Sequence, residues 1–174
     1  MKTRLHAAGA DRRDALTLLA GVPLLASLPA VAAPAEPGQS VAWPDVTLLD
    51  GSRWGAAQAR DKAVIVVFWS TTCPFCLRHN AHVEKLRRAT AGQALEILTV
   101  ARERDPAAVR AYLARHGYGF QVTLDQGPMS ASLSMRRVIP LTAVVHRSGR
   151  LKHVIPGEMF EEDVMEFRSL GLRG

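Results

Sequence analysis

An apolar run that ends at a pair of cysteines constrains this chain more than any other feature. Residues 63–69 read Ala-Val-Ile-Val-Val-Phe-Trp, and Cys73 and Cys76, the only cysteines in the chain, follow directly after. The run is too short to span a membrane, and its β-branched residues do not alternate with polar ones, which indicates a strand buried on both faces. Apolar residues then recur at helical spacing over residues 77–86, which predicts an amphipathic helix. The cysteines therefore lie where a central strand gives way to a helix.

This junction predicts different roles for the two cysteines. Cys73 lies at or next to the helix N-cap, Pro74 takes the first helical position, where a missing N–H is harmless, and Cys76 follows one turn in. Unpaired N–H groups and the positive end of the helix dipole favour the thiolate over the thiol at Cys73. We therefore predict that Cys73 is the nucleophile. Cys76 is placed to attack the mixed disulfide formed at Cys73 and to release the partner in reduced form.

Two cysteines at this spacing could instead form a structural disulfide or bind a metal ion. A disulfide across four residues closes so little chain that it contributes only about 2 kcal/mol, whereas a staple generally joins distant segments. A zinc site usually needs a second cysteine pair or a histidine pair, and the chain has no second cysteine pair. We favour redox chemistry by the cysteines themselves, with no organic cofactor and no bound metal.

The first 32 residues have the pattern of an export signal. Basic residues, among them the pair Arg12-Arg13, precede a modestly apolar stretch over residues 15–28, and Ala30-Val31-Ala32 supplies a small-x-small cleavage pattern. The arginine pair resembles a twin-arginine signal, and the general secretory route is the alternative. A disordered basic tail and an uncleaved membrane anchor are the competing interpretations. We predict cleavage after residue 32 and export to the periplasm.

The chain after the signal is predicted to form one α/β domain over residues 40–174, preceded by a Pro/Ala linker over residues 33–39. Asp50-Gly51 between two β-capable runs predicts an N-terminal hairpin. The expected elements after the central strand and its helix are strands at 94–101 and 120–124, helices at 106–116 and 129–135, a second hairpin over 141–155 and a closing helix at 160–170. Strand–helix–strand order implies a parallel pair, and the late hairpin makes the sheet mixed.

Charge argues against one class of partner. The formal net charge is +6, but Lys and Arg form no run interleaved with aromatic residues. We therefore expect no nucleic-acid binding and attribute the charge to a solvated surface. The chain is expected to be a monomer.

The order of elements and several short motifs resemble the thioredoxin fold. The motifs are the hairpin with Asp50-Gly51, Trp69-Ser-Thr-Thr-Cys73-Pro-Phe-Cys76 and Val138-Ile139-Pro140-Leu141-Thr142. The likeness extends to the exported TlpA/ResA/CcmG-like thiol-disulfide oxidoreductases of the AhpC/TSA-Redoxin-like group, and it covers roughly residues 40–170. It implies a thioredoxin-like fold: a central mixed β-sheet flanked by helices, with an N-terminal β-hairpin extension.

The resemblance also implies a surface on which substrate proteins dock. It makes Pro140 a cis-proline that faces the dithiol, where an ordinary trans proline at a strand start is the alternative. The N–H and C=O of Ile139 would then pair with an incoming polypeptide beside Cys73, and Trp69 would contribute to the same docking site.

Three positions depart from the pattern of these relatives. Many relatives have an acidic residue six positions after the first cysteine that helps to move the proton of the buried thiol, and this chain has His79 there. His79 is the candidate proton carrier. The alternative, which we favour because Arg78 and His82 are expected to face solvent, places His79 on the surface. Val67 replaces the buried acid of cytoplasmic thioredoxins, and Thr72 stands where relatives often have Trp.

Together these features predict a periplasmic thiol-disulfide oxidoreductase. The resemblance implies a reductase of disulfides in exported client proteins, acting in cytochrome c maturation or on the thiols of copper sites and supplied by a membrane electron donor. One alternative is an oxidase or isomerase that forms disulfides. Another is a non-enzymatic chaperone that binds Cu(I) through both thiolates.

Overall fold

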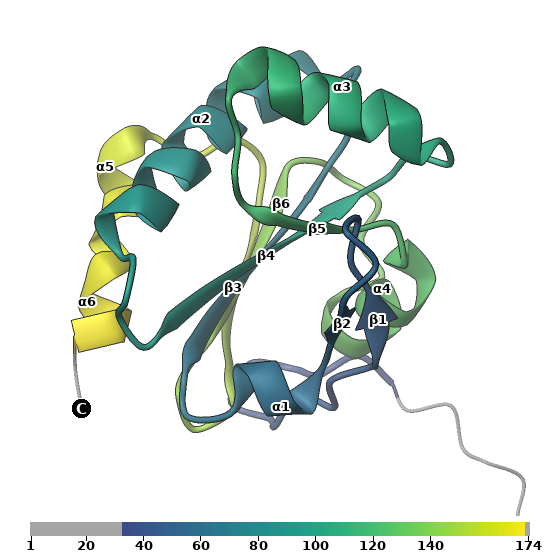
Figure 1. Cartoon of the computed structure of the whole chain (residues 1–174). Helices are drawn as coiled ribbons and strands as arrows, with labels where there is room; N and C mark the ends of the chain where they lie inside the picture. Colours follow the sequence, from purple (N-terminus) through teal and green to yellow (C-terminus); the bar gives the residue numbers. More distant parts are fainter. Residues whose placement is uncertain (1–32, 173–174) are drawn as a thin grey trace, which may run out of the picture. The chain divides into compact units, whose positions relative to one another are not determined.

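The computed structural model describes residues 33–172, which form a five-stranded mixed sheet covered by helices on both faces (Figure 1). The strands of the sheet follow the order β5-β4-β3-β6-β7, and β1 and β2 pair separately as an antiparallel hairpin. The strands are β1 (Val46–Thr47), β2 (Arg53–Trp54), β3 (Ala63–Trp69), β4 (Leu95–Ala101), β5 (Gln121–Thr123), β6 (Leu141–Val145) and β7 (Leu151–Pro156). The helices are α1 (Ala56–Ala59), α2 (Pro74–Ala89), α3 (Pro106–His116), α4 (Gln126–Leu133), α5 (Glu161–Glu166) and α6 (Arg168–Leu172).

Strand β3 is the centre of the sheet, as its sequence predicts. All seven of its residues are buried. It runs parallel to β4, with Ile65 opposite Ile97, and antiparallel to β6, with Ile65 opposite Val144. The expected mixed sheet is therefore confirmed, and so are the two expected hairpins, β1–β2 beside the sheet and β6–β7 within it.

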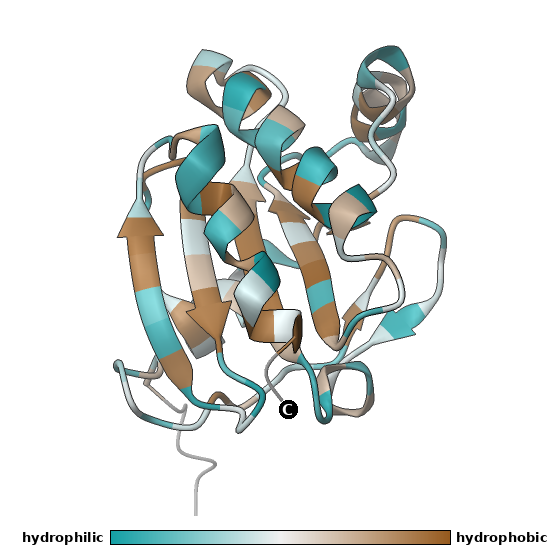
Figure 2. Ribbon diagram, turned by 90° about the vertical axis from the view of Figure 1, so that its left-hand side faces the viewer, coloured by the Kyte–Doolittle hydropathy of each residue, from teal (hydrophilic) through white to brown (hydrophobic). Residues whose placement is uncertain are grey.

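Alternate residues of β3 contribute to two separate cores. Ile65, Val67 and Trp69 face the core that α2, α3 and α5 cover, whereas Val64 and Phe68 face the core under α1, α4 and the β1–β2 hairpin. This division follows from the two-residue period of a strand. Figure 2 shows the mostly hydrophobic strands beneath helices whose outward residues are hydrophilic.

The N-terminal hairpin covers one edge of the sheet. Leu48 forms an antiparallel bridge with Thr123 of the edge strand β5, and the Leu49 N–H donates to the Val122 carbonyl at 2.7 Å. The segment expected to be a linker, residues 33–39, is also held to the domain, because the Ala35 N–H donates to Ser132 O at 3.0 Å. The sequence indicated a free linker because its prolines and alanines carry no strand or helix pattern.

Two helices differ from their predicted bounds. Helix α4 begins at Gln126, three residues earlier than expected, because Pro128 lies in the first turn, where the helix does not need its N–H. The closing helix is divided at Phe167, whose N–H bonds to Val164 O in a tighter turn at 3.2 Å.

No helix among residues 33–172 combines the length and apolar character that a membrane crossing requires. The predicted export signal falls within residues 1–32, outside the described part of the chain.

Candidate active site

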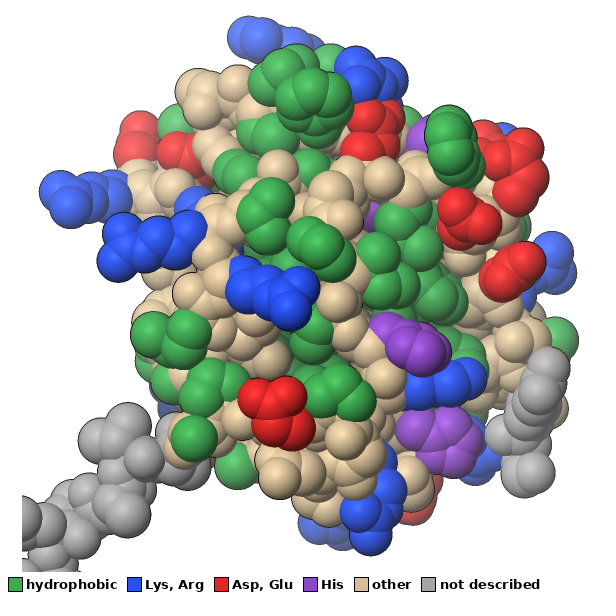
Figure 3. Space-filling model, turned by 180° about the vertical axis from the view of Figure 1, so that it is seen from behind, with side chains coloured by type: hydrophobic (Ala, Val, Ile, Leu, Met, Phe, Trp, Pro, Cys, Tyr) green, Lys and Arg blue, Asp and Glu red, His purple; other side chains and the backbone are tan. Residues whose placement is uncertain are grey.

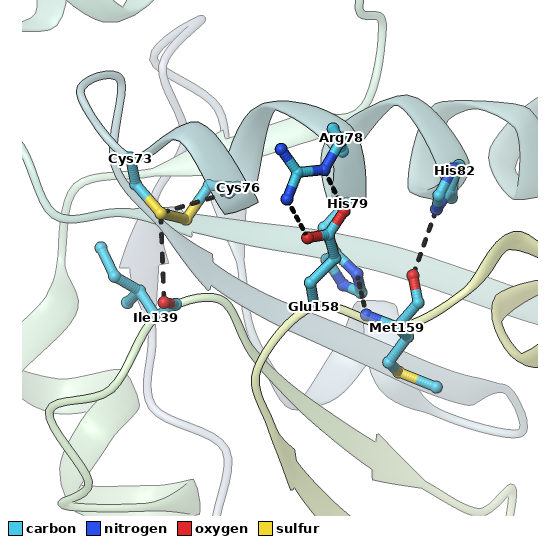
Figure 4. A network of polar contacts seen from close by, with 8 residues as sticks. All are labelled: Cys73, Cys76, Arg78, His79, His82, Ile139, Glu158 and Met159. Atoms are coloured by element: carbon cyan, nitrogen blue, oxygen red, sulfur yellow. Dashed lines mark hydrogen bonds and ion pairs between the residues drawn. A yellow bond between two sulfur atoms is a disulfide. The ribbon is translucent and has the colours of Figure 1, made fainter.

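The two cysteines form a disulfide at the start of α2, where the sequence places them (Figure 4). Cys73 is the N-cap, with extended backbone at φ −90° and ψ 113°, and Pro74 is the first helical residue. The Cys76 N–H donates to Cys73 Sγ at 3.2 Å, so a free backbone donor of the first turn points at this sulfur. The same N–H group is placed to stabilise a thiolate on Cys73 once the disulfide is reduced.

Only one of the two cysteines is accessible to a partner protein. Cys76 has an exposed fraction of 0%, whereas Cys73 is half-buried. The Ile139 carbonyl oxygen lies 4.0 Å from Cys73 Sγ, on the side away from the helix (Figure 4). A thiol that reacts with this disulfide therefore reaches Cys73 first.

The peptide bond between Ile139 and Pro140 is cis, as the resemblance implies. Pro140 is buried and its carbonyl accepts from the Gly157 N–H at 2.8 Å, which fixes the loop to the residue after β7. Ile139 is half-buried, and its N–H has no hydrogen bond to the described residues. An unpaired backbone N–H beside the reactive sulfur can donate a hydrogen bond to an extended chain that adds as a strand.

Trp69 lies in the core and not on a docking surface, which corrects its predicted role. Its exposed fraction is 0%, and its ring lies 5.0 Å from that of Tyr112 and 6.1 Å from that of Phe120, centroid to centroid. The reason is strand alternation, because Trp69 shares the face of Ile65 beneath α3.

His79 is buried, so the surface position favoured from the sequence is wrong. Its exposed fraction is 0%. The Met159 N–H donates to Nδ1 at 3.3 Å, which leaves Nε2 as the protonated nitrogen of a neutral ring, and Nε2 lies 3.0 Å from Thr142 Oγ1. Burial, together with the charge of nearby His82, lowers the pKa of His79 to about 4. The ring therefore joins α2 to β6 and to the loop after β7 as a neutral side chain.

Helix α2 buries a more polar face than its sequence suggests. Leu77 is 38% exposed, whereas Asn80 and Glu84 are buried. Glu84 accepts from Arg87 at 2.8 Å, from Arg88 at 2.8 Å and from the Gly119 N–H at 3.0 Å. Burial acts to raise the pKa of Glu84, but these donors outweigh it and lower the pKa to about 2.

Glu103 supports the turn before the cysteines, a role that we did not predict. Its Oε1 accepts from Ser70 Oγ at 2.7 Å, from the Thr71 N–H at 2.7 Å and from Thr71 Oγ1 at 2.8 Å. Burial acts to raise the pKa of Glu103, and these hydrogen bonds hold it below its usual value. A signal existed, because Glu103 follows β4, and parallel strands bring their carboxyl ends to the same edge of a sheet.

No group of three or more His, Cys, Asp or Glu within residues 33–172 is arranged to hold a metal ion.

Comparisons with known proteins agree with this geometry. The family named Redoxin matches residues 36–170. The thiol-disulfide oxidoreductase ResA of Halalkalibacterium halodurans is 30% identical over 122 residues, which are 70% of this chain and 69% of that protein. ResA of Geobacillus kaustophilus is 28% identical, over 70% of this chain and 71% of that protein.

Two solved structures show the same fold. A thiol:disulfide interchange protein of the thioredoxin family from Chlorobium tepidum superposes with a TM-score of 0.71 at 20% identity, over 79% of this chain and 99% of that one. StoA from Bacillus subtilis superposes with a TM-score of 0.64 at 19% identity, over 77% of this chain and 98% of that one. The expected thioredoxin-like fold is confirmed.

Proposed function

The chain belongs to the Redoxin family and is a thiol-disulfide oxidoreductase, and from this premise we propose that it reduces disulfides in exported client proteins in the periplasm. The observation that carries the proposal is the pairing of one accessible sulfur, Cys73, with a cis-proline loop whose Ile139 carbonyl lies 4.0 Å away. The export pattern of residues 1–32 supports the location.

The reaction proceeds by two exchanges. In the reduced protein the Cys73 thiolate attacks one sulfur of a client disulfide, so that a mixed disulfide forms and the first client thiolate leaves. The Cys76 thiolate then attacks Cys73 Sγ, the second client thiolate leaves, and Cys73 and Cys76 remain as the disulfide seen here. Two electrons have passed to the client, and a membrane electron donor of dithiol type restores the reduced form.

Docking of the client uses the backbone beside the sulfur. The free N–H and the carbonyl of Ile139 pair with an extended client segment, which brings a client sulfur to Cys73. Cys76 is shielded from the client because it is fully buried. This arrangement favours intramolecular attack by Cys76 over attack by a second external thiol.

The reductive direction rests on the resemblance to the TlpA/ResA/CcmG-like proteins, and the reduction potential of the couple tests it. We expect a value near or below about −270 mV when the mature domain is equilibrated with dithiothreitol and glutathione buffers. A value near about −120 mV would identify an oxidant of client thiols instead.

Single cysteine variants test the order of the two steps. Cys76→Ser should accumulate mixed disulfides with client proteins, because the second exchange is lost, whereas Cys73→Ser should abolish exchange. Retained disulfide reduction by Cys73→Ser would show that the nucleophile is misassigned. The two variants are matched controls, since each removes one sulfur from the same helix turn.

His79 remains a predicted proton carrier. It is buried and lies three residues after Cys76 on the same helix. Its Nδ1 already accepts from the Met159 N–H, so the ring can take a proton there only if that bond opens. Replacement by Ala should slow exchange mainly below pH 7 if the ring carries protons, and an unchanged pH profile would restrict His79 to a structural role.

A further inference from the structure

Large hydrophobic side chains are exposed between the two cysteines and along the segment that leads to Ile139. Phe75 lies between the two cysteines and is 55% exposed, and Met135 and Val138, in the segment that leads to Ile139, are 68% and 43% exposed. That segment ends 4.0 Å from Cys73 Sγ at the Ile139 carbonyl. Hydrophobic side chains that gather at one place on a surface mark an interaction site more often than single exposed ones do.

The same segment is basic and is held in place by a third arginine. Arg136 and Arg137 are both exposed. Arg102, which follows β4, donates through Nη2 to the Arg136 carbonyl at 2.9 Å and through Nη1 to the Arg137 carbonyl. Its guanidinium carbon lies 5.6 Å from the centroid of the buried Phe68 ring. One partly buried arginine therefore holds the backbone of two others, which come two and three residues before Ile139.

Arg136 and Arg137 form no ion pair within the described part of the chain. Their guanidinium groups also make no hydrogen bond with a residue between 33 and 172. The carboxylate of Glu103, on the same loop as Arg102, is occupied by hydroxyl and backbone donors near Cys73. Burial lowers the pKa of Arg102, and the positive charge of Arg137 lowers it further by a smaller amount. The two guanidinium groups therefore lie close enough to repel each other.

Apolar and basic side chains together define the chemistry of what fits here. Figure 3 shows one face of the molecule, on which hydrophobic side chains lie among basic, acidic and histidine side chains. An acidic segment complements the arginines, and apolar side chains next to its acids would cover Met135 and Val138. A basic segment would meet like charges on Arg136 and Arg137.

We propose that residues 135–139, together with Phe75, form a docking surface for an extended client segment that carries Asp or Glu beside its reactive cysteine. The surface is called the Arg136–Arg137 surface below. This inference rests on the proposed function and names the class of client that the site takes. The client backbone pairs with Ile139, its cysteine meets Cys73, and its acidic side chains contact Arg136 and Arg137.

A pair of peptide disulfides tests the proposal. Both are short symmetrical dimers linked through one cysteine, with the same apolar residues, and they differ only in having Asp or Lys beside that cysteine. Reduced full-length protein should react with the Asp peptide about tenfold faster than with the Lys peptide at low ionic strength, and salt should shrink the ratio. The intrinsic reactivities of the peptides cancel when this ratio is compared between protein variants.

Variants that each remove one positive charge show whether the ratio depends on Arg136 and Arg137. Arg137→Gln and Arg136→Gln should each reduce the ratio severalfold, whereas Lys152→Gln, which removes one exposed charge at the end of β7 remote from Cys73, should leave it unchanged. An unchanged ratio in Arg136→Gln and Arg137→Gln, or the same loss of ratio in Lys152→Gln, would overturn the proposal while exchange itself persisted. No exchange with either peptide would instead overturn the proposed function.

Discussion

Burial of His79 predicts that acid destabilises this protein in a defined pH range. The pKa of His79 is about 4 in the folded protein, against an ordinary value of 6.5, because burial penalises the charged ring. Between these values the unfolded chain binds a proton that the folded chain does not. The free energy of unfolding therefore falls as the pH falls from about 6.5 to about 4.

The shift sets the size of this effect. Each pKa unit is worth about 1.4 kcal/mol, so the change in His79 removes about 3 kcal/mol of stability between neutral pH and pH 4. Within the range the slope approaches about 1.4 kcal/mol per pH unit, the value for one proton. A loss of this size is large for a domain whose total stability is typically about 5–15 kcal/mol.

Urea unfolding of the oxidised protein at several pH values between 4.5 and 7 measures the slope. His79→Gln should flatten it by about one proton, whereas His153→Gln, at an exposed position on β7, should leave it as in the wild type. If His79→Gln does not fold, an NMR titration of the wild-type imidazole gives the pKa directly. The reasoning is refuted by an imidazole that titrates near 6.5, or by equal slopes in wild type and His79→Gln.

Three further variants test the packing around the site. Glu84→Gln should lower the free energy of unfolding by about 1.5–3 kcal/mol, because the amide replaces a carboxylate bonded to two arginines and to the Gly119 N–H; a change below about 0.5 kcal/mol in urea unfolding would contradict this. Leu86→Ala, in the fully buried face of α2, should cost about 2–5 kcal/mol by the same measurement, and a smaller loss would mean that the core collapses around the cavity. Asp105→Ala removes the N-cap of α3, whose carboxylate accepts from the Ala107 N–H at 2.9 Å. Thermal unfolding should show that the free energy of unfolding falls by about 1 kcal/mol, and an unchanged value would contradict this role of Asp105.

The fold was largely predictable because its signals are local. Each signal can be recognised within a stretch of about ten to fifteen residues. This holds for the apolar run of β3, for the Asp50-Gly51 turn and for the hairpin of β6 and β7. The start of α4 was placed three residues too late: the helix begins at Gln126, and its first turn tolerates Pro128.

Polar residues on α2 show why the site was harder to predict than the fold. Asn80 and Glu84 gave the helix a polar appearance, and burial of Glu84 is possible only because Gly119, 35 residues away, supplies a donor beside the two arginines of the same helix. Hydropathy describes a side chain alone, whereas the cost of burying it depends on the partners it meets.

The sequence by itself determined the strand, the helix and the difference between the two cysteines, since Cys73, Pro74 and Cys76 form the N-terminal turn from contiguous residues. Tertiary structure decided which distant groups meet that turn. The Ile139 carbonyl lies beside Cys73, although the two residues are 66 positions apart in the sequence. The Thr142 hydroxyl likewise contacts the ring of His79, 63 positions away. Backbone and hydrogen-bonding preferences within one turn are written in adjacent residues, but burial and charge at a site depend on the packing of elements far apart in the chain.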